Sequence, residues 1–313
     1  HPRPDEATRT IGTGRVAAYA RGDDYHILLR RRVNDLGGWL EARIPGCRTR
    51  GVVDSAPFSE REFGWLAGLG WFGKNCLLID PLAGSYFLLT ALLTDLDLPV
   101  AEPIRVDHCG TCTACLDACP TGAFVAPRVL DAGRCISGIT IEQRGPVPAA
   151  LRPSMGAWVF GCDVCQEVCP WNGKAPGSAE PTLQPRDGAD GLGLADLLGL
   201  DETAFRARFR GSAILRAKRS GVIRSAAIAL GNRPDPTAAP ALVAAIDDDD
   251  PIIRGAAAWA LGRWRAAERS LADQATAALE RRRMVEDDPT VRLEIETALD
   301  DVVTARGLPS GEP

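Results

Sequence analysis

The stretch Cys109-Gly110-Thr111-Cys112-Thr113-Ala114-Cys115-Leu116-Asp117-Ala118-Cys119-Pro120 places four cysteines at spacings of two, two and three residues, followed by proline. A second run, Cys162-x2-Cys165-x3-Cys169-Pro170, repeats the end of this pattern. In bacterial two-cluster ferredoxins such a run gives three thiolates to one 4Fe-4S cluster, and its last cysteine crosses to the other cluster. The two runs therefore predict a bacterial ferredoxin-like region that holds two 4Fe-4S clusters and carries electrons.

The second run lacks a cysteine at its front, and Cys135, between the runs, is the candidate to replace it. We therefore expect two ligand sets: Cys109, Cys112, Cys115 and Cys169 on one cluster, and Cys119, Cys135, Cys162 and Cys165 on the other. Two other interpretations stay open, a disulfide framework and structural zinc, although two-residue spacings suit disulfides poorly. Cys47 and Cys76 fit neither run, and we expect them to be small buried apolar groups.

Length and composition suggest a globular protein of two or three domains, since the chain has 313 residues and is 45% hydrophobic. No apolar stretch approaches the length of a membrane helix, so we expect no membrane contact, a cytoplasmic location and a monomer. The chain begins at His1 without an initiator methionine, which predicts that an N-terminal part is missing. The net charge of −5 predicts no general affinity for nucleic acid.

Three segments differ in pattern along the chain. Residues 1–104 read as α/β, with helical spacing of apolar residues over 28–40 and short buried strands at 51–53, 77–79 and 86–93. Residues 105–185 contain the cysteines and a linker rich in proline and glycine. Residues 186–313 turn to alanine and leucine and predict an all-α region.

Within the last segment, two stretches nearly repeat. Val222–Gly231 and Ile252–Gly262 resemble each other, and their arginines Arg224 and Arg254 are 30 residues apart. Pro289 to Arg292 would open a third unit. This period, with Asp-Pro turns, is typical of HEAT-like helical repeats, although a small helical bundle is the alternative.

Several motifs along residues 15–232 resemble the epoxyqueuosine reductase family. They are Tyr19-Ala20-Arg21-Gly22-Asp23-Asp24-Tyr25-His26, Val53-Asp54-Ser55-Ala56-Pro57, Gly68-Leu69-Gly70-Trp71-Phe72-Gly73-Lys74-Asn75, Cys135-Ile136-Ser137 with Thr140-Ile141-Glu142, Phe160-Gly161-Cys162-Asp163, Cys169-Pro170-Trp171-Asn172 and the stretch from Arg224 to Asn232. One position departs from the family: Ala91 stands where the family usually has a glutamate, so any role of that glutamate is in doubt here.

The resemblance implies an α/β cobalamin-binding domain before the clusters, and an oxidoreductase that converts epoxyqueuosine at the wobble position of tRNA into queuosine. The cofactors would be two 4Fe-4S clusters and cobalamin, with electrons passing from the clusters to cobalamin. An external donor of the flavodoxin or ferredoxin type would supply them, and the cofactor would carry the redox chemistry.

The resemblance also assigns residues. Asp54 would be the proton donor, and burial among Val52, Val53 and Ala56 would raise its pKa; from the residues alone, an Asp that caps a turn before Pro57 is the alternative. The expected cobalamin contacts are Tyr25, His26, Asp54, Lys74, Asn75, Leu78 and Ser85. A structural role for the histidine stays open.

A basic stretch marks the start of the repeats. We expect its side chains to bind tRNA phosphates, although a solvated cationic face is the alternative. The residues are Arg206, Arg208, Arg210, Arg216, Lys218, Arg219 and Arg224. Two rival functions remain: a cobalamin-dependent reductive dehalogenase, and a ferredoxin-like electron carrier with an interaction domain.

Overall fold

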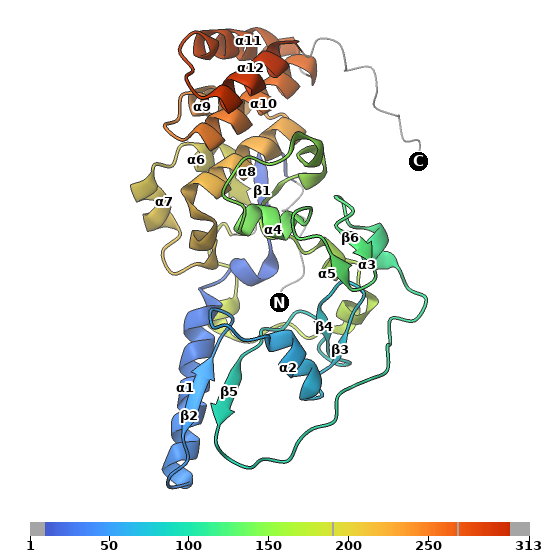
Figure 1. Ribbon diagram of the computed structural model, residues 1–313. Coiled ribbons are helices and arrows are strands. Elements are labelled where there is room, and N and C mark those ends of the chain that lie inside the picture. The colour runs from blue at the N-terminus through green and yellow to red at the C-terminus, as the bar shows by residue number, and fades with distance from the viewer. Residues whose placement is uncertain (1–9, 190, 268, 301–313) are drawn as a thin grey trace.

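A computed structural model describes residues 10–189, 191–267 and 269–300 (Figure 1). Its central element is a three-stranded sheet in which β1 (Thr13–Val16) lies between β8 (Trp158–Phe160) and β9 (Leu192–Gly193). β1 runs parallel to β8 and antiparallel to β9. Each of the three predicted segments contributes one strand. The expected boundaries at 104/105 and 185/186 therefore do not separate independent cores.

The N-terminal α/β part forms an arm that projects away from this sheet (Figure 1). Asp24 accepts a hydrogen bond from the His26 amide and caps α1 (Tyr25–Arg43), which packs on β2 (Thr49–Val52). Gly37 permits the close approach, since a Cβ there would lie 2.5 Å from the Thr49 hydroxyl. β2 pairs antiparallel with β5 (Ala91–Thr94).

The predicted strand over residues 86–93 is wrong for its first part, because only the residues from Ala91 onward form β5. The Ser85 amide donates to Asn172 Oδ1 at 2.7 Å, which anchors the chain against the cysteine region. Residues 86–90 span the distance from that anchor to β2 and do not pair as a strand.

The cysteine region contains short elements only. α3 (Ala114–Asp117) and α5 (Val164–Glu167), one from each cysteine run, pack together. The remaining elements around them are α2 (Glu60–Leu66), the hairpin of β3 (Trp71–Phe72) and β4 (Leu78–Ile79), the hairpin of β6 (Phe124–Ala126) and β7 (Val129–Leu130), and α4 (Ile136–Ile141).

The C-terminal part is a stack of helices (Figure 1). Its elements are α6 (Leu194–Leu198), α7 (Glu202–Arg208), a 3₁₀ turn (Ala213–Ala217), α8 (Lys218–Asn232), α9 (Ala239–Ala245), α10 (Pro251–Ala267), α11 (Arg269–Arg283) and α12 (Pro289–Asp300). α8, α10 and α12 carry the repeated pattern and pack in that order, so the predicted third unit is present. Asp250 and Asp288 accept amide hydrogen bonds in the first turns of α10 and α12.

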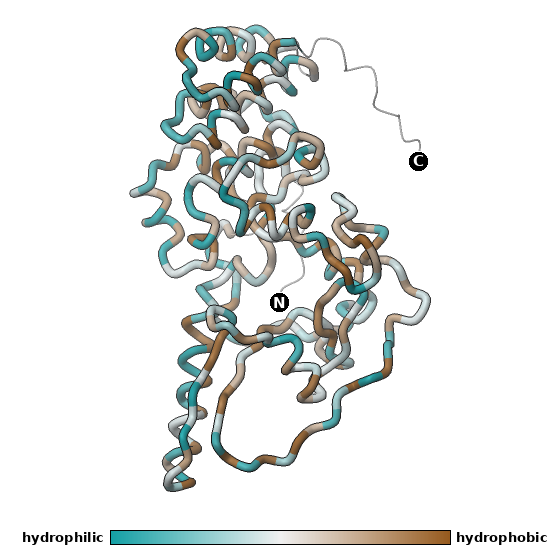
Figure 2. Tube along the Cα trace, viewed as in Figure 1, coloured by the Kyte–Doolittle hydropathy of each residue, from teal (hydrophilic) through white to brown (hydrophobic). Residues whose placement is uncertain are grey.

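One hydrophobic core extends from the central sheet through α4 and α8 into the repeats, and contains Val16, Ile139, Phe160, Ile223 and Leu261. Figure 2 shows hydrophobic and hydrophilic positions interleaved along the stacked helices, as expected where one face of each helix is buried. No helix among the described residues is both long and apolar enough to cross a membrane.

Candidate active site

The first expected set of cluster ligands comes together from both cysteine runs. Burial raises the pKa of the Cys115 thiol, and the nearby thiols of Cys169, Cys109 and Cys112 raise it further. These are the four cysteines of that set. All ten cysteines are free, which argues against a disulfide framework.

The second set is also largely assembled. Burial raises the pKa of the Cys162 thiol to about 12, and Cys135 is among its charged neighbours. Cys165 has both of these thiols near it, and Cys115 of the first set as well, so the two groups adjoin. Cys119 accepts a hydrogen bond from the Ala123 amide at 3.3 Å. Amide hydrogen bonds to thiolate sulfur are one of the means by which proteins adjust cluster potentials. Two adjoining groups of thiols suit a pair of 4Fe-4S clusters, and the place of Cys119 in the second set stays a prediction.

Three of the expected cobalamin contacts, Lys74, Asn75 and Ser85, form hydrogen bonds to the cysteine region. The Lys74 ammonium donates to the carbonyls of Gly110 and Cys112 at 2.7 and 2.8 Å, and Asn75 donates to the Cys165 carbonyl at 3.4 Å. Leu78 is buried in β4, and the Ser85 hydroxyl donates to Gln166 at 2.9 Å. The loop that ends in Lys74-Asn75 thus supports both cysteine runs.

Asp54 follows β2 and faces the start of α1. Its carboxylate accepts a hydrogen bond from the Tyr25 hydroxyl on Oδ2, and its Oδ1 lies 2.7 Å from His26 Nε2. The other ring nitrogen of His26 lies 2.6 Å from Asp24 Oδ1. The rings of Tyr25 and His26 stack with centroids 4.1 Å apart. Asp54 therefore contacts two side chains of α1, Tyr25 and His26. An aspartate whose only role is to cap the turn before Pro57 would not need these contacts.

The pKa of Asp54 does not follow the expectation that burial raises it. Burial is the largest single influence and acts upward, but the hydrogen bonds from His26 and Tyr25 outweigh it and hold the Asp54 pKa below its usual range. The carboxylate is 40% exposed, which limits the effect of burial. The pKa of His26 is raised, chiefly by its hydrogen bond to Asp54. The hydrogen bond between the two side chains thus favours the charged form of each, a protonated His26 and an ionised Asp54.

This triad of Tyr25, His26 and Asp54 forms one wall of a pocket of about 440 Å³. Phe160, at the end of β8, lines the same pocket, together with Glu142 and Arg216. Glu142 Oε1 and Oε2 accept hydrogen bonds from Arg216 Nε and Nη2, each at 3.0 Å. Tyr19, Phe160 and Glu142 stand in the family-like motifs, but the sequence alone gave them no role.

Two elements connect the pocket to the second thiol group. α4 starts directly after Cys135, and Ile141 at its other end lines the pocket. β8 ends at the pocket residue Phe160 and continues through Gly161 to Cys162. Gly161 has a φ of 67°, and a Cβ there would lie 2.4 Å from the Ala17 methyl group. The pocket walls and two cluster ligands are therefore parts of the same short segments.

The basic residues at the start of the repeats divide into two groups. Arg208, Arg210 and Lys218 are exposed, as are Arg206, paired with Glu202, and Arg216. Arg219 is largely buried and paired with Asp248.

The prediction that Arg224 binds tRNA phosphate is wrong. It is 1% exposed, and its guanidinium donates to the carbonyls of Ile139, Gln143 and Gly145. Burial lowers its pKa to about 10. Arg224 is therefore a structural link between the cysteine region and α8, and it cannot reach a phosphate at the surface.

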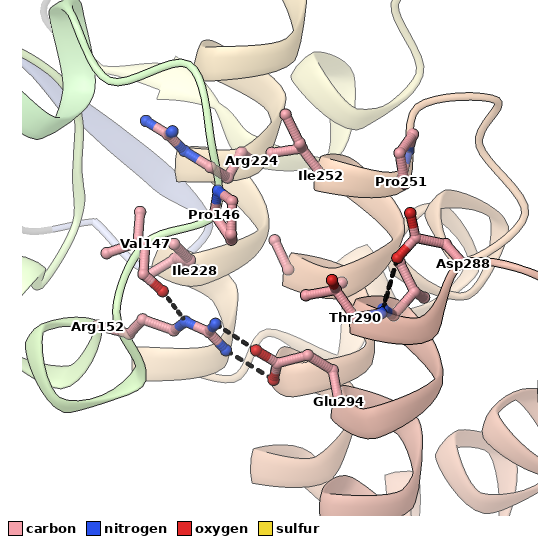
Figure 3. Close-up of a pocket in the computed structure, with 13 residues that line it drawn as sticks. Pro146, Val147, Arg152, Arg224, Ile228, Pro251, Ile252, Asp288, Thr290 and Glu294 are labelled. Atoms are coloured by element: carbon pink, nitrogen blue, oxygen red, sulfur yellow. Dashed lines mark hydrogen bonds and ion pairs between the residues drawn. The ribbon is translucent and has the colours of Figure 1, made fainter.

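A second, small pocket of about 120 Å³ lies where the loop after α4 meets α10 and α12 (Figure 3). Val147, Ile228 and Ile252 contribute to its apolar lining. Beside it, the buried Arg152 donates to the Val147 carbonyl at 2.8 Å and forms a two-pronged ion pair with Glu294 of α12. These contacts connect the cysteine region to the repeats.

Comparisons with known proteins agree with this architecture. Residues 108–172 match the family model of a 4Fe-4S double cluster binding domain, and residues 211–300 match HEAT repeats. Residues 1–55 match a model described as epoxyqueuosine reductase QueG, DUF1730. Fold and thiol groups together define an iron–sulfur protein with two clusters and a helical-repeat end.

Curated relatives identify the family. The chain is 47% identical over 219 residues to the epoxyqueuosine reductase of Pseudomonas aeruginosa, covering 70% of this chain and 61% of that one. It is 42% identical over 262 residues to that of Xanthomonas campestris pv. campestris, covering 82% and 74%. The chain belongs to the epoxyqueuosine reductase family, whose members are oxidoreductases, and it spans roughly two thirds of the length of the curated relatives that it matches.

Solved structures agree as well. An epoxyqueuosine reductase in complex with an epoxyqueuosine-modified tRNA-Tyr stem loop matches with a TM-score of 0.86 at 35% identity, covering 95% of this chain and 76% of that one. The enzyme from Bacillus subtilis, in a structure whose catalytic aspartate loop is swung out of the active site, matches with a TM-score of 0.85 at 34% identity, covering 95% and 77%.

Proposed function

We propose that this protein reduces epoxyqueuosine in tRNA to queuosine. The reaction takes two electrons and two protons: both C–O bonds of the epoxide break, a C=C bond forms, and the oxygen leaves as water. The observation that carries the proposal is the 440 Å³ pocket, which is lined both by the Tyr25–His26–Asp54 triad and by segments continuous with Cys135 and Cys162. One site thus adjoins both a source of protons and a source of electrons.

Cobalamin is the redox cofactor in this proposal, and the two 4Fe-4S clusters supply its electrons. The pocket suits an electron acceptor because two short segments lead from it to Cys135 and Cys162, but its volume accommodates part of a corrinoid, not the whole. Tyr25, His26 and Asp54 would face the cofactor from one side, and Phe160 from the other. When bound, cobalamin would supply a metal centre that accepts electrons singly and passes them to the epoxide.

Asp54 acts as proton donor through its partners. Its contact with His26 favours an ionised Asp54 and a proton on the His26 nitrogen that faces it. A substrate that covers the exposed part of the carboxylate would remove more water and raise the Asp54 pKa, which favours transfer of the His26 proton to Asp54 and onward to the epoxide oxygen. The B. subtilis relative, with its catalytic aspartate loop, supports a role for the loop that carries Asp54.

The tRNA would approach from the side of the exposed cations, Arg206, Arg208, Arg210, Arg216 and Lys218. The stem-loop complex of a relative supports this substrate class, and a base that reacts in such a pocket has to leave its stack. A flavodoxin or ferredoxin as electron donor, a cytoplasmic location and a monomeric state remain predictions.

The test is the variant Asp54→Asn, assayed for conversion of epoxyqueuosine-containing tRNA under reducing conditions. Loss of one positioned proton donor should lower the turnover rate about 10²- to 10⁴-fold, while iron and sulfide contents stay at the wild-type level. Turnover at the wild-type rate in this variant would exclude Asp54 as the donor. An optical titration with cobalamin distinguishes the proposed reductase from the rival ferredoxin-like electron carrier. The carrier should form no complex with cobalamin.

A further inference from the structure

Besides the Tyr25–His26–Asp54 triad, the pocket is lined by one further pair of oppositely charged side chains among the described residues, Glu142 and Arg216. Both side chains are largely in solvent, with 53% of Glu142 and 67% of Arg216 exposed. Exposed ion pairs contribute about 0–1 kcal/mol to stability, so this pair exchanges partners at little cost. Asp54 differs, because it is held by donors from two residues.

The backbone beneath the pair is fixed independently of it. Arg144 Nη2 donates to the Arg216 carbonyl at 2.9 Å, and its Nη1 donates to the carbonyls of Ile141 and Ala217, each at 3.1 Å. One guanidinium thus joins the end of α4 to the 3₁₀ turn that carries Arg216. When the ion pair opens, Glu142 and Arg216 still line the pocket; Arg216 then lacks a partner, and Glu142 keeps the more distant Arg144, 3.8 Å away.

We propose that Glu142 and Arg216 form an exchangeable clamp that recognises the two charges of the modified nucleotide. This inference rests on the proposed function. Glu142 binds the secondary ammonium that links the cyclopentane ring of epoxyqueuosine to its 7-deazaguanine, and Arg216 turns to a backbone phosphate near that nucleotide. The substrate replaces one ion pair by two, so no charge is left without a partner when the pocket closes around it.

The assignment of the cation to Glu142 follows from the other carboxylates nearby. Asp54 already accepts hydrogen bonds from Tyr25 and His26, and it has to take up a proton during the reaction. Asp24 is occupied by the His26 ring and the His26 amide. Within the described part of the chain, the Glu142 carboxylate pairs with Arg216 and, at 3.8 Å, with Arg144, and Glu142 lines the pocket.

The experiment measures equilibrium binding of two tRNAs that differ at the wobble 7-deazaguanine, one carrying a cationic aminomethyl group and the other a neutral nitrile. Wild-type protein should bind the aminomethyl tRNA roughly tenfold more tightly, as expected for one hydrogen bond to a charged group. Glu142→Gln should bind both tRNAs equally, while Glu142→Asp should keep part of the preference. Asp95→Asn, which removes the acid of the exposed Arg48–Asp95 pair on the arm, is the matched control and should keep the wild-type ratio.

Substitution of Arg216 should change a different property, the salt dependence of tRNA binding. Arg216→Gln should reduce the slope of log affinity against log salt by about 0.7–0.9, the contribution of one phosphate contact, and should leave the aminomethyl preference in place. A wild-type preference in Glu142→Gln, or an equal loss of affinity for both tRNAs, would overturn the clamp. Absence of turnover on epoxyqueuosine with an intact binding preference would count against the proposed reaction alone.

Discussion

At the scale of single residues, the proton of this site belongs to His26 more than to Asp54. Asp24 and Asp54 face its two ring nitrogens, and Asp54 favours the charged imidazole. The direction of the pH dependence follows from the raised pKa of His26: the ring is protonated below that pKa and loses its proton as pH rises through it. The protonated form therefore persists to higher pH than in an isolated histidine.

This gives a pH prediction. The rate of tRNA conversion should fall as pH rises through the raised pKa of His26, because the donor to Asp54 is then lost. His26→Asn keeps a hydrogen-bonding side chain that does not titrate, so it should be slower and should lack this alkaline fall. The measurement is kcat/KM against pH for both proteins, together with their unfolding temperatures. An unchanged alkaline limb in His26→Asn would assign it to another group.

At the scale of elements, the helical repeats depend on a buried charge cluster between α10, α11 and α12. Glu286 is 0% exposed and accepts hydrogen bonds from Arg254 on both oxygens at 2.8 Å, and from Arg282 at 2.8 Å. Burial opposes its charge, but these arginines and the Asp288 amide prevail and lower its pKa from 4.5 to about 2. Its stabilising effect is present above pH 4.5 and is lost as pH falls toward 2.

Glu286→Gln should destabilise the repeats by about 3 kcal/mol, because it leaves the largely buried Arg254 without its counter-charge and leaves Arg282 with only the more distant Asp247. Chemical unfolding followed by the helical signal measures this loss at pH 7. The difference in free energy of unfolding between the wild-type protein and Glu286→Gln should become smaller in acid. Glu280→Gln, an exposed position on α11, is the control and should change stability by less than about 0.5 kcal/mol. Equal stability of the two variants would show that the cluster contributes nothing.

At the scale of the whole molecule, tRNA affinity should depend on exposed cations beside the pocket and not on cations elsewhere. Arg208→Gln combined with Arg210→Gln should lower the slope of log affinity against log salt by about 1.4–1.8, since two phosphate contacts are removed. Arg283→Gln, an exposed charge at the end of α11, should leave the slope unchanged. A slope equally insensitive to all three changes would place the tRNA on another face.

Local pattern predicted much of this molecule. Helical spacing located α1, and the near-repeat with its Asp-Pro turns located α10 and α12, because these signals lie within a few residues of each other. The cysteine spacing predicted thiol groups that the fold largely brings together. Long-range contacts escaped prediction: the pairing of β1 with β8, the position of Lys74 under a cysteine loop, and the burial of Arg224. Each depends on chain segments far apart in sequence, about which periodicity carries no information.

The continuity between Cys135, α4 and the pocket, and between Cys162 and β8, has a consequence for a protein exposed to air. Oxygen that destroys the second cluster would release the cysteine-bound end of each of the two segments that shape the substrate site. Damaged molecules would then lose their grip on tRNA together with their capacity to reduce it. Inactivated copies would leave the substrate free for intact ones and would not compete for it.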